Sequence, residues 1–72
     1  MSDVHPLIGF RLRQIPVLSQ RQLADLLGVS RETIWRWETG ARKIEASRLP
    51  QIAELTGIPA RELRPDLADL LE

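Results

Sequence analysis

Apolar positions along the chain fall into short stretches with helical spacing, and glycines and prolines separate these stretches. The separating residues are Pro6, Pro16, Gly28, Gly40, Gly57, Pro59 and Pro65. Because the intervals between them are short and no stretch alternates like a strand, the pattern predicts an all-α protein. We expect a compact bundle of five to six short helices.

The first helix is expected over about residues 6–14. Pro6 suits the first helical position, where its missing N–H costs little. Ile8, Leu12 and Ile15 follow one another at i, i+4 and i+7, which predicts that they form the buried stripe of this helix.

The second helix has the strongest start signal. Ser19 is followed three residues later by Gln22, the spacing of a capping box, and Gly28 stands where a left-handed residue would end the helix. The predicted inner face consists of Leu23, Ala24 and Leu27.

A third helix is expected over residues 31–39, after a connection of only about three residues. Ser30 is its predicted N-cap and Gly40 its end. Ile34 and Trp37 share one side of this helix, so we expect them to pack into the core.

The fourth helix is expected to be capped by Ser47, with Pro50 in its first turn, and to end at Thr56-Gly57. Its apolar residues available to the core are Leu49, Ile52, Ala53 and Leu55. Residues 58–63 are expected to form at most one helical turn. A last short helix should begin at Pro65.

We interpret residues 1–72 as one domain, with a core over residues 6–58 and an acidic tail over residues 59–72. The tail carries four leucines, Leu63, Leu67, Leu70 and Leu71. At helical spacing they either complete the core or form a dimer contact, and we favour a homodimer.

Two short helices joined by a glycine-containing turn have the geometry of a helix-turn-helix, whose second helix enters the DNA major groove. The segment SQRQLADLLGVSRETIWRWETG, residues 19–40, closely resembles the family that includes the Cro and lambda-repressor DNA-binding domains, the XRE-type helix-turn-helix family. The following segment TGIPARELRPD, residues 56–66, looks like the tail of small Cro-like and antitoxin-like regulators of prophages. The resemblance implies a lambda-repressor-like fold.

The resemblance also implies site residues. Phosphate contacts are expected from Gln20, Ser30, Arg42 and Lys43, and base edges are expected to meet Arg31, Glu32 and Arg36. The chemistry agrees, since arginine can bond bidentately to guanine and glutamate can accept from cytosine. Trp35 and Thr39 are additional candidates for contacts with sugar or thymine methyl groups. Arg13 and Glu38 correspond to family positions that form a structural ion pair between the first and third helices.

Some of these side chains also have structural interpretations. Glu32 precedes Arg36 by four residues, so the two can form an ordinary helical ion pair. Trp35 faces either a groove or a protein partner. His5 is expected to be a solvated residue near the terminus.

The composition limits the possible functions. The chain has no cysteine and one histidine, so we expect no metal site, no cofactor and no enzymatic activity. No apolar run is long enough to span a bilayer, and no signal-like segment begins the chain, so we expect a cytoplasmic protein without membrane contact.

A formal net charge of zero argues against a nucleic-acid partner, but the charges are segregated along the chain. Residues 11–48 hold eight Lys or Arg against four Asp or Glu, whereas residues 49–72 hold two against five. We therefore expect the acidic tail to face away from DNA.

The sequence favours a regulator of transcription that binds double-stranded DNA, a Cro-like repressor of phage type that recognises a short palindromic operator as a dimer. The alternative is an antitoxin-like or other interaction module that uses the acidic leucine tail to bind a toxin or another regulator. DNA binding by the isolated protein at low salt separates the two.

Overall fold

The computed structural model describes residues 4–70, in which helices are the only regular secondary structure. The elements are α1 (Pro6–Arg13), α2 (Gln20–Leu27), α3 (Arg31–Thr39), the 3-10 helix η1 (Ala46–Arg48), α4 (Leu49–Thr56), α5 (Ala60–Leu63) and the 3-10 helix η2 (Pro65–Leu70). The predicted all-helical bundle is confirmed. None of the helices within residues 4–70 is long and apolar enough to cross a membrane.

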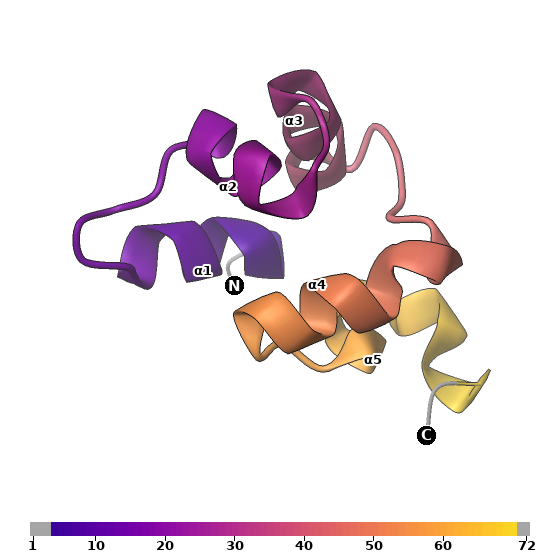
Figure 1. The fold of residues 1–72 in the computed structure, drawn as a ribbon. Helices are drawn as coiled ribbons and strands as arrows, with labels where there is room; N and C mark the ends of the chain where they lie inside the picture. Colours follow the sequence, from indigo (N-terminus) through magenta and orange to yellow (C-terminus); the bar gives the residue numbers. More distant parts are fainter. Residues whose placement is uncertain (1–3, 71–72) are drawn as a thin grey trace.

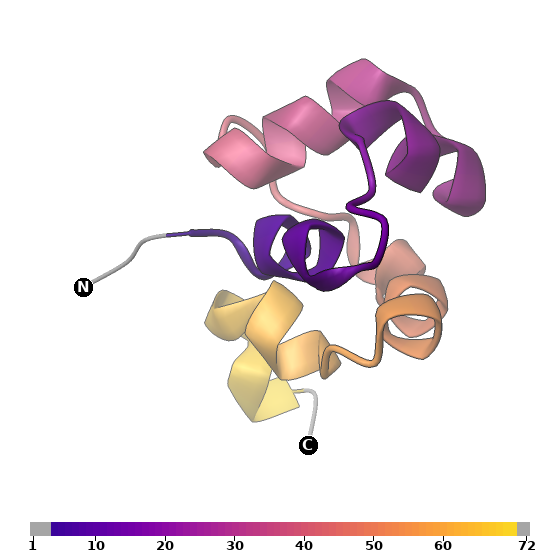
Figure 2. The ribbon, with the colours of Figure 1, turned by 90° about the vertical axis from the view of Figure 1, so that its left-hand side faces the viewer.

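Helices α2 and α3 pack against each other on one side of α1 (Figure 1). The view from the side places α4, α5 and η2 on the opposite side of α1 (Figure 2). The core fills the space between these groups. Its buried side chains are Leu7, Leu23, Ala24, Leu27, Ile34, Trp37, Ile44, Leu49, Ile52, Ile58 and Leu63.

The buried face of α1 is not the predicted one. Leu7 is fully buried and Phe10 packs partly against the core, so the stripe expected from Ile8, Leu12 and Ile15 is wrong. The helix ends before Ile15, whose side chain is 98% exposed, so the spacing that linked this residue to the stripe has no structural meaning. Leu12 points outward as well.

His5 is half-buried rather than solvated, because it caps α1. Its Nδ1 accepts a hydrogen bond from the backbone N–H of Leu7 at 3.1 Å. Burial lowers the pKa of the imidazole, an effect that the nearby Glu38 carboxylate partly opposes.

The start of α2 and the turn to α3 follow the sequence closely. Ser19 Oγ accepts from the N–H of Gln22 at 3.0 Å, and Gln22 Oε1 accepts from the N–H of Ser19 at 2.8 Å, so the capping box is confirmed. Gly28 ends α2 with a φ of 71°. Ser30 then caps α3 by accepting from the N–H of Thr33 at 3.1 Å.

The predicted cap of α4 by Ser47 is wrong. Ser47 lies inside η1, and η1 continues directly into α4, with the N–H of Leu49 bonded to the carbonyl of Ala46. The preceding 3-10 turn thus takes the place of a side-chain cap at this end. Pro50 does occupy the first turn, as expected, whereas Leu55 is exposed instead of buried.

The tail is part of the fold. Leu63 on α5 is buried and Leu67 on η2 packs partly against the core, so the core extends beyond the expected limit at residue 58. Leu70 is 81% exposed. Leu71 lies outside the described residues.

Candidate nucleic-acid interface

Helix α3 is fixed from its inner side. Ile34 and Trp37 are buried in the core, and Ala24 on α2 is almost completely covered, which lets α2 and α3 approach closely. The connection Gly28–Ser30 is three residues long, as the sequence predicts. This packing leaves the opposite side of α3 open to a ligand.

The five side chains expected to face bases all lie on this open side of α3, because their positions repeat at helical spacing. They are Arg31, Glu32, Trp35, Arg36 and Thr39, of which Arg36 is partly covered and the other four are exposed. The structure therefore presents donors, an acceptor and an aromatic ring on one helical surface.

Within this surface, Glu32 and Arg36 form the ion pair that their spacing allows, with 3.5 Å between Oε2 and Nη2. Both side chains remain substantially exposed, so water competes with the pair. The hydroxyl of Thr39 donates to the carbonyl of Arg36 at 3.3 Å. The guanidinium of Arg36 can therefore exchange its exposed pair with Glu32 for a base.

Arg31 is connected to the interior through Gln20. Its Nη1 donates to Gln20 Oε1 at 3.2 Å, and Gln20 Nε2 donates to Glu38 Oε1 at 2.9 Å. Gln20, expected at the DNA phosphates, therefore also orients the guanidinium of Arg31. This orientation reduces the side-chain entropy that Arg31 would lose on binding a base.

Glu38 forms its structural ion pair with Arg11, not with the predicted Arg13. Arg11 Nε lies 2.6 Å from Glu38 Oε2, and Arg11 Nη2 donates to Glu38 Oε1 at 2.9 Å. Arg11 follows the buried Leu7 by four residues and shares its face of α1, whereas Arg13 is exposed. The spacing from Leu7 was the sequence signal that could have identified Arg11.

The expected phosphate contacts beyond Gln20 lie at the two ends of α3. Ser30 is exposed at the N-terminus, where free backbone N–H groups and the helix dipole favour anions. Arg42 and Lys43 are exposed in the loop after Gly40, and the N–H of Arg42 donates to the carbonyl of Arg36 at 3.1 Å. These cations flank the helix on its C-terminal side.

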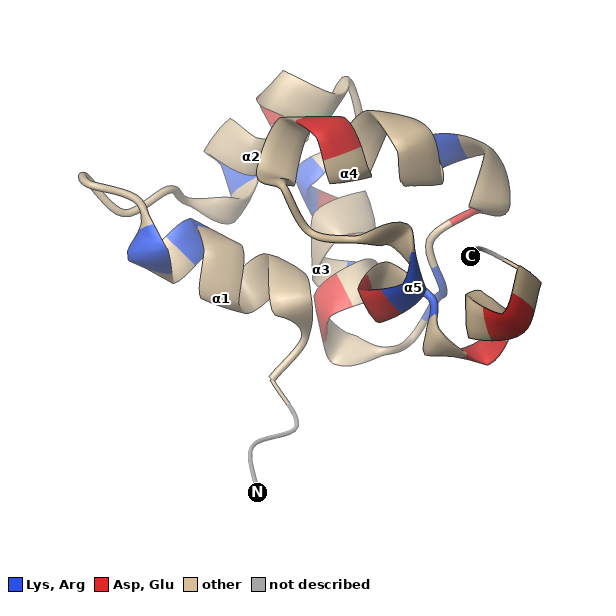
Figure 3. Cartoon of the chain, turned by 90° about the horizontal axis from the view of Figure 1, so that it is seen from below, with Lys and Arg blue, Asp and Glu red and all other residues tan. Residues whose placement is uncertain are grey.

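The acidic tail is not separated from this basic loop. Asp66 Oδ2 lies 3.4 Å from Lys43 Nζ, so the tail contacts the loop directly at this position. Figure 3 shows an acidic and a basic position next to each other on α5, the helix that precedes this contact. Hydrogen bonds from Arg64, with a smaller contribution from Lys43, hold the pKa of Asp66 well below its usual range. Sequence reasoning missed Arg64 and Asp66, because their contact with the loop depends on how the tail folds back.

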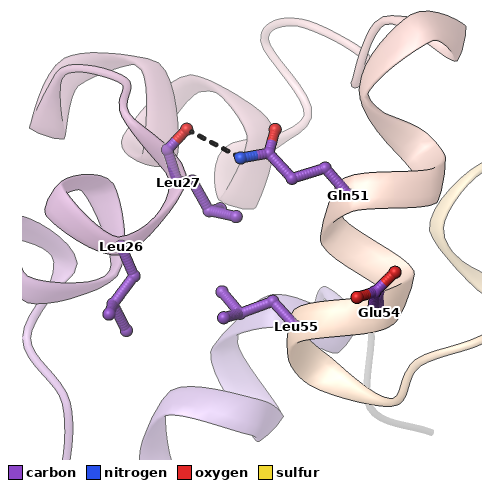
Figure 4. Close-up of a pocket in the computed structure, with 5 residues that line it drawn as sticks. All are labelled: Leu26, Leu27, Gln51, Glu54 and Leu55. Carbon is purple, nitrogen blue, oxygen red and sulfur yellow. Dashed lines mark hydrogen bonds between the residues drawn. The ribbon is translucent and has the colours of Figure 1, made fainter.

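A second exposed feature is an apolar groove of about 570 Å³ between α2 and α4 (Figure 4). Leu26 and Leu27 line one wall, and Leu55 and Glu54 line the other. Gln51 Nε2 crosses the groove to donate to the carbonyl of Leu27 at 3.4 Å. This surface has no counterpart in the predicted site.

The described residues offer hydrogen bonding and charge rather than metal chemistry. Residues 4–70 contain no group of three or more His, Asp or Glu side chains suited to hold a metal ion. The arrangement on α3 is suited to contact base edges, and the groups at its ends are suited to contact phosphates.

Comparison with known proteins gives matches to regulators. A 58-residue segment, 79% of the chain, is 33% identical to an uncharacterized HTH-type transcriptional regulator of Sinorhizobium medicae and covers 42% of it. A 68-residue segment, 90% of the chain, is 38% identical to an uncharacterized transcriptional regulator in the ATPase CF(0) region of Rhodospirillum rubrum and covers 61% of it. The chain thus spans about half the length of these curated relatives. No solved structure matches significantly.

A family model described as helix-turn-helix matches residues 18–63, which include α2, the turn, α3 and the helices up to the end of α5. The matched span covers more than half of the chain and agrees with the geometry of these elements. The chain therefore belongs to the helix-turn-helix family, of the XRE type that includes the Cro and lambda-repressor domains.

Proposed function

We propose that this protein is a transcriptional regulator that binds double-stranded DNA in a sequence-specific manner. The observation that carries the proposal is the placement of the five candidate base-reading residues on the outer side of α3, whose inner side is fixed in the core. Family membership and the names of the relatives support it.

Selection of binding sites from random duplexes tests this function. We expect a short motif, because Arg31 and Arg36 can exchange their exposed contacts with Gln20 and Glu32 for bidentate contacts with guanine. Substitution Arg36→Ala should relax specificity at one base position and cost roughly 1–3 kcal/mol there. Arg61→Ala is the matched control, since Arg61 is equally a surface arginine but lies on α5. Binding without sequence preference would contradict base reading by α3.

We further propose a Cro-like repressor that binds a palindromic operator as a homodimer and occupies a promoter. Two copies would place two recognition helices in successive major grooves, about 34 Å apart. Resemblance to Cro and lambda repressor supports this finer proposal. A reporter promoter that carries the selected site should be silenced by the protein. Activation of that promoter would contradict repression.

The structure restricts which tail leucines are available for a dimer contact. Leu63 is buried within the monomer and Leu67 is partly covered, whereas Leu70 is 81% exposed. We expect Leu70→Glu to convert the dimer to a monomer in light scattering coupled to gel filtration. Leu12→Glu, an equally apolar-to-acidic change at another exposed leucine, should leave the dimer intact. A monomeric wild-type protein would contradict the dimer.

The alternative is an interaction module of antitoxin-like type, which binds a toxin or another regulator. The apolar groove lined by Leu26 and Leu55 is a better candidate surface for such a partner than the tail is. The tail leucines Leu63 and Leu67 pack in or against the core of the monomer. This alternative predicts negligible DNA affinity of the isolated protein even at low salt, where phosphate contacts are strongest.

A further inference from the structure

The C-terminal 3-10 helix η2 brings a carboxylate to the basic loop that follows α3. Asp66 Oδ2 lies 3.4 Å from Lys43 Nζ. The side chain of Lys43 is 68% exposed, and Asp66 is the acidic side chain with which it pairs. Lys43, Arg64 and Asp66 line one hollow of about 180 Å³.

The carboxylate of Asp66 is held more firmly than the ammonium of Lys43. Arg64 donates to both of its oxygens, from Nε to Oδ1 at 2.9 Å and from Nη2 to Oδ2 at 2.8 Å. Arg64 Nη1 also donates to the carbonyl of Ile44 at 2.6 Å, and the neighbouring Leu63 is buried. The tail is thereby fixed to the loop, and Asp66 stays beside Lys43.

The two cations of the loop, Arg42 and Lys43, differ in whether they pair with an acidic side chain. Arg42 forms no ion pair with any acidic side chain within residues 4–70, so its guanidinium is available to an anion. Lys43 shares its charge with Asp66, so a DNA phosphate has to compete with this carboxylate for the ammonium group. While it remains with Asp66, it displaces no cation from the DNA.

We propose that Asp66 is an internal counterion of Lys43, which competes with DNA phosphate for the ammonium group and thereby sets the strength and salt dependence of DNA binding. The proposal rests on the DNA-binding function proposed above. Asp66 is a positioning residue in this scheme, because it acts on DNA only through Lys43. The same competition favours base contacts over non-specific backbone contacts.

The proposal is tested by titrating a duplex of arbitrary sequence with the protein and following fluorescence anisotropy. The salt concentration is varied from about 50 to about 200 mM, because affinity that comes from phosphate contacts falls steeply over this range. Asp66→Asn should bind more tightly than wild type and lose affinity more steeply with salt, by roughly an additional threefold over this range, as for about one more phosphate contact. Asp69→Asn is the matched control, because it makes the same change in net charge on the same exposed segment.

The effect of Asp66→Asn must depend on Lys43. In a Lys43→Ala background, Asp66→Asn should change the DNA affinity and its salt dependence no more than Asp69→Asn does. Equal salt dependence of the Asp66 and Asp69 variants would overturn the proposal, as would a gain that persists without Lys43. Loss of binding by every form of the protein at the lowest salt would contradict the proposed function itself, and this inference with it.

A second comparison uses chains in which Asp66 and its contact with Arg64 are intact. Arg42→Ala should flatten the salt dependence by about one phosphate contact, and Lys43→Ala should flatten it by clearly less. This comparison applies even if Asp66→Asn does not fold, which circular dichroism would reveal. An equal effect of the two substitutions would overturn the proposal.

Discussion

Glu38 accepts three hydrogen bonds while only 3% of its side chain is exposed. Two come from Arg11 and one comes from Gln20, so a single carboxylate joins α1, α2 and α3. A buried carboxylate without a cation would carry a large desolvation cost. We infer that the pair with Arg11 fixes the relative position of the three helices, and with it the orientation of Arg31.

Removal of Arg11 tests this role. Arg11→Ala should lower the free energy of unfolding by about 3–5 kcal/mol, because it leaves Glu38 buried without its counterion. Arg13→Ala should change it by less than about 0.5 kcal/mol, since Arg13 is exposed. Urea unfolding of both variants measures the difference. Equal effects would show that Glu38 does not depend on Arg11.

The cap of α1 gives stability a dependence on pH. Burial lowers the pKa of His5 in the folded protein below its ordinary value of 6.5, so the unfolded chain binds the proton more strongly. The contribution of neutral His5 to the free energy of unfolding is therefore complete above pH 6.5. It is lost as the pH falls from 6.5 through the lower pKa that His5 has in the folded protein. Protonation at Nδ1 would also abolish the hydrogen bond from Leu7.

Asparagine at this position separates the cap from the titration. His5→Asn keeps a side-chain acceptor for α1 but does not titrate, so it should lose less stability than wild type between about pH 7 and about pH 5. Thermal unfolding of both proteins across this range measures the difference. A wild-type protein with no greater loss would contradict the role of His5.

At the scale of elements, local signals in the sequence were sufficient for the ends of α2 and α3. Ser19, Gly28 and Ser30 determine the backbone through hydrogen bonds or backbone conformation within a few residues, so sequence spacing reports them directly. The face of α1 and the start of α4 were predicted wrongly. The buried face of α1 depends on contacts with other parts of the chain, and the start of α4 depends on a 3-10 turn. Sequence spacing reveals neither.

Gly28 in the turn after α2 and Gly9 inside α1 should respond in opposite ways to alanine. Gly28→Ala should destabilise the protein by about 1–2 kcal/mol, because φ at this position is 71° and a side chain is strained there. Gly9→Ala in α1 should stabilise it by about 0.5–1 kcal/mol. The added Cβ would lie 3.0 Å from Nη1 of Arg13, the end of an exposed and flexible side chain that can move.

Chemical denaturation of the two alanine variants checks the signs. Destabilisation by Gly9→Ala would mean that Arg13 cannot move away, which would give it a structural role after all. A neutral effect of Gly28→Ala would contradict the requirement for a left-handed residue between α2 and α3.

For the whole molecule, the candidate site was more predictable than the contact between the tail and the loop after α3. The face of α3 follows from helical spacing and could be identified from the sequence together with the family resemblance. The position of Asp66 beside Lys43 could not, because it requires the tail to fold back over the loop after α3. Segment charges indicated a basic region and an acidic tail but not the contact between Lys43 and Asp66 that joins them.

The tail therefore belongs to the folding unit, and Leu63 provides the test. It is buried with residues of α1, α2, α3 and α4, so Leu63→Ala should cost about 2–5 kcal/mol, through lost apolar burial and the cavity that remains. A small domain has only about 5–15 kcal/mol of total stability, so this loss should be visible as a large decrease in the unfolding midpoint. Leu12→Ala is the matched control, because Leu12 is exposed and should change stability by about 0.5 kcal/mol or less. If the two variants were equally stable, residues 59–70 would be an appendage on a core that ends at residue 58.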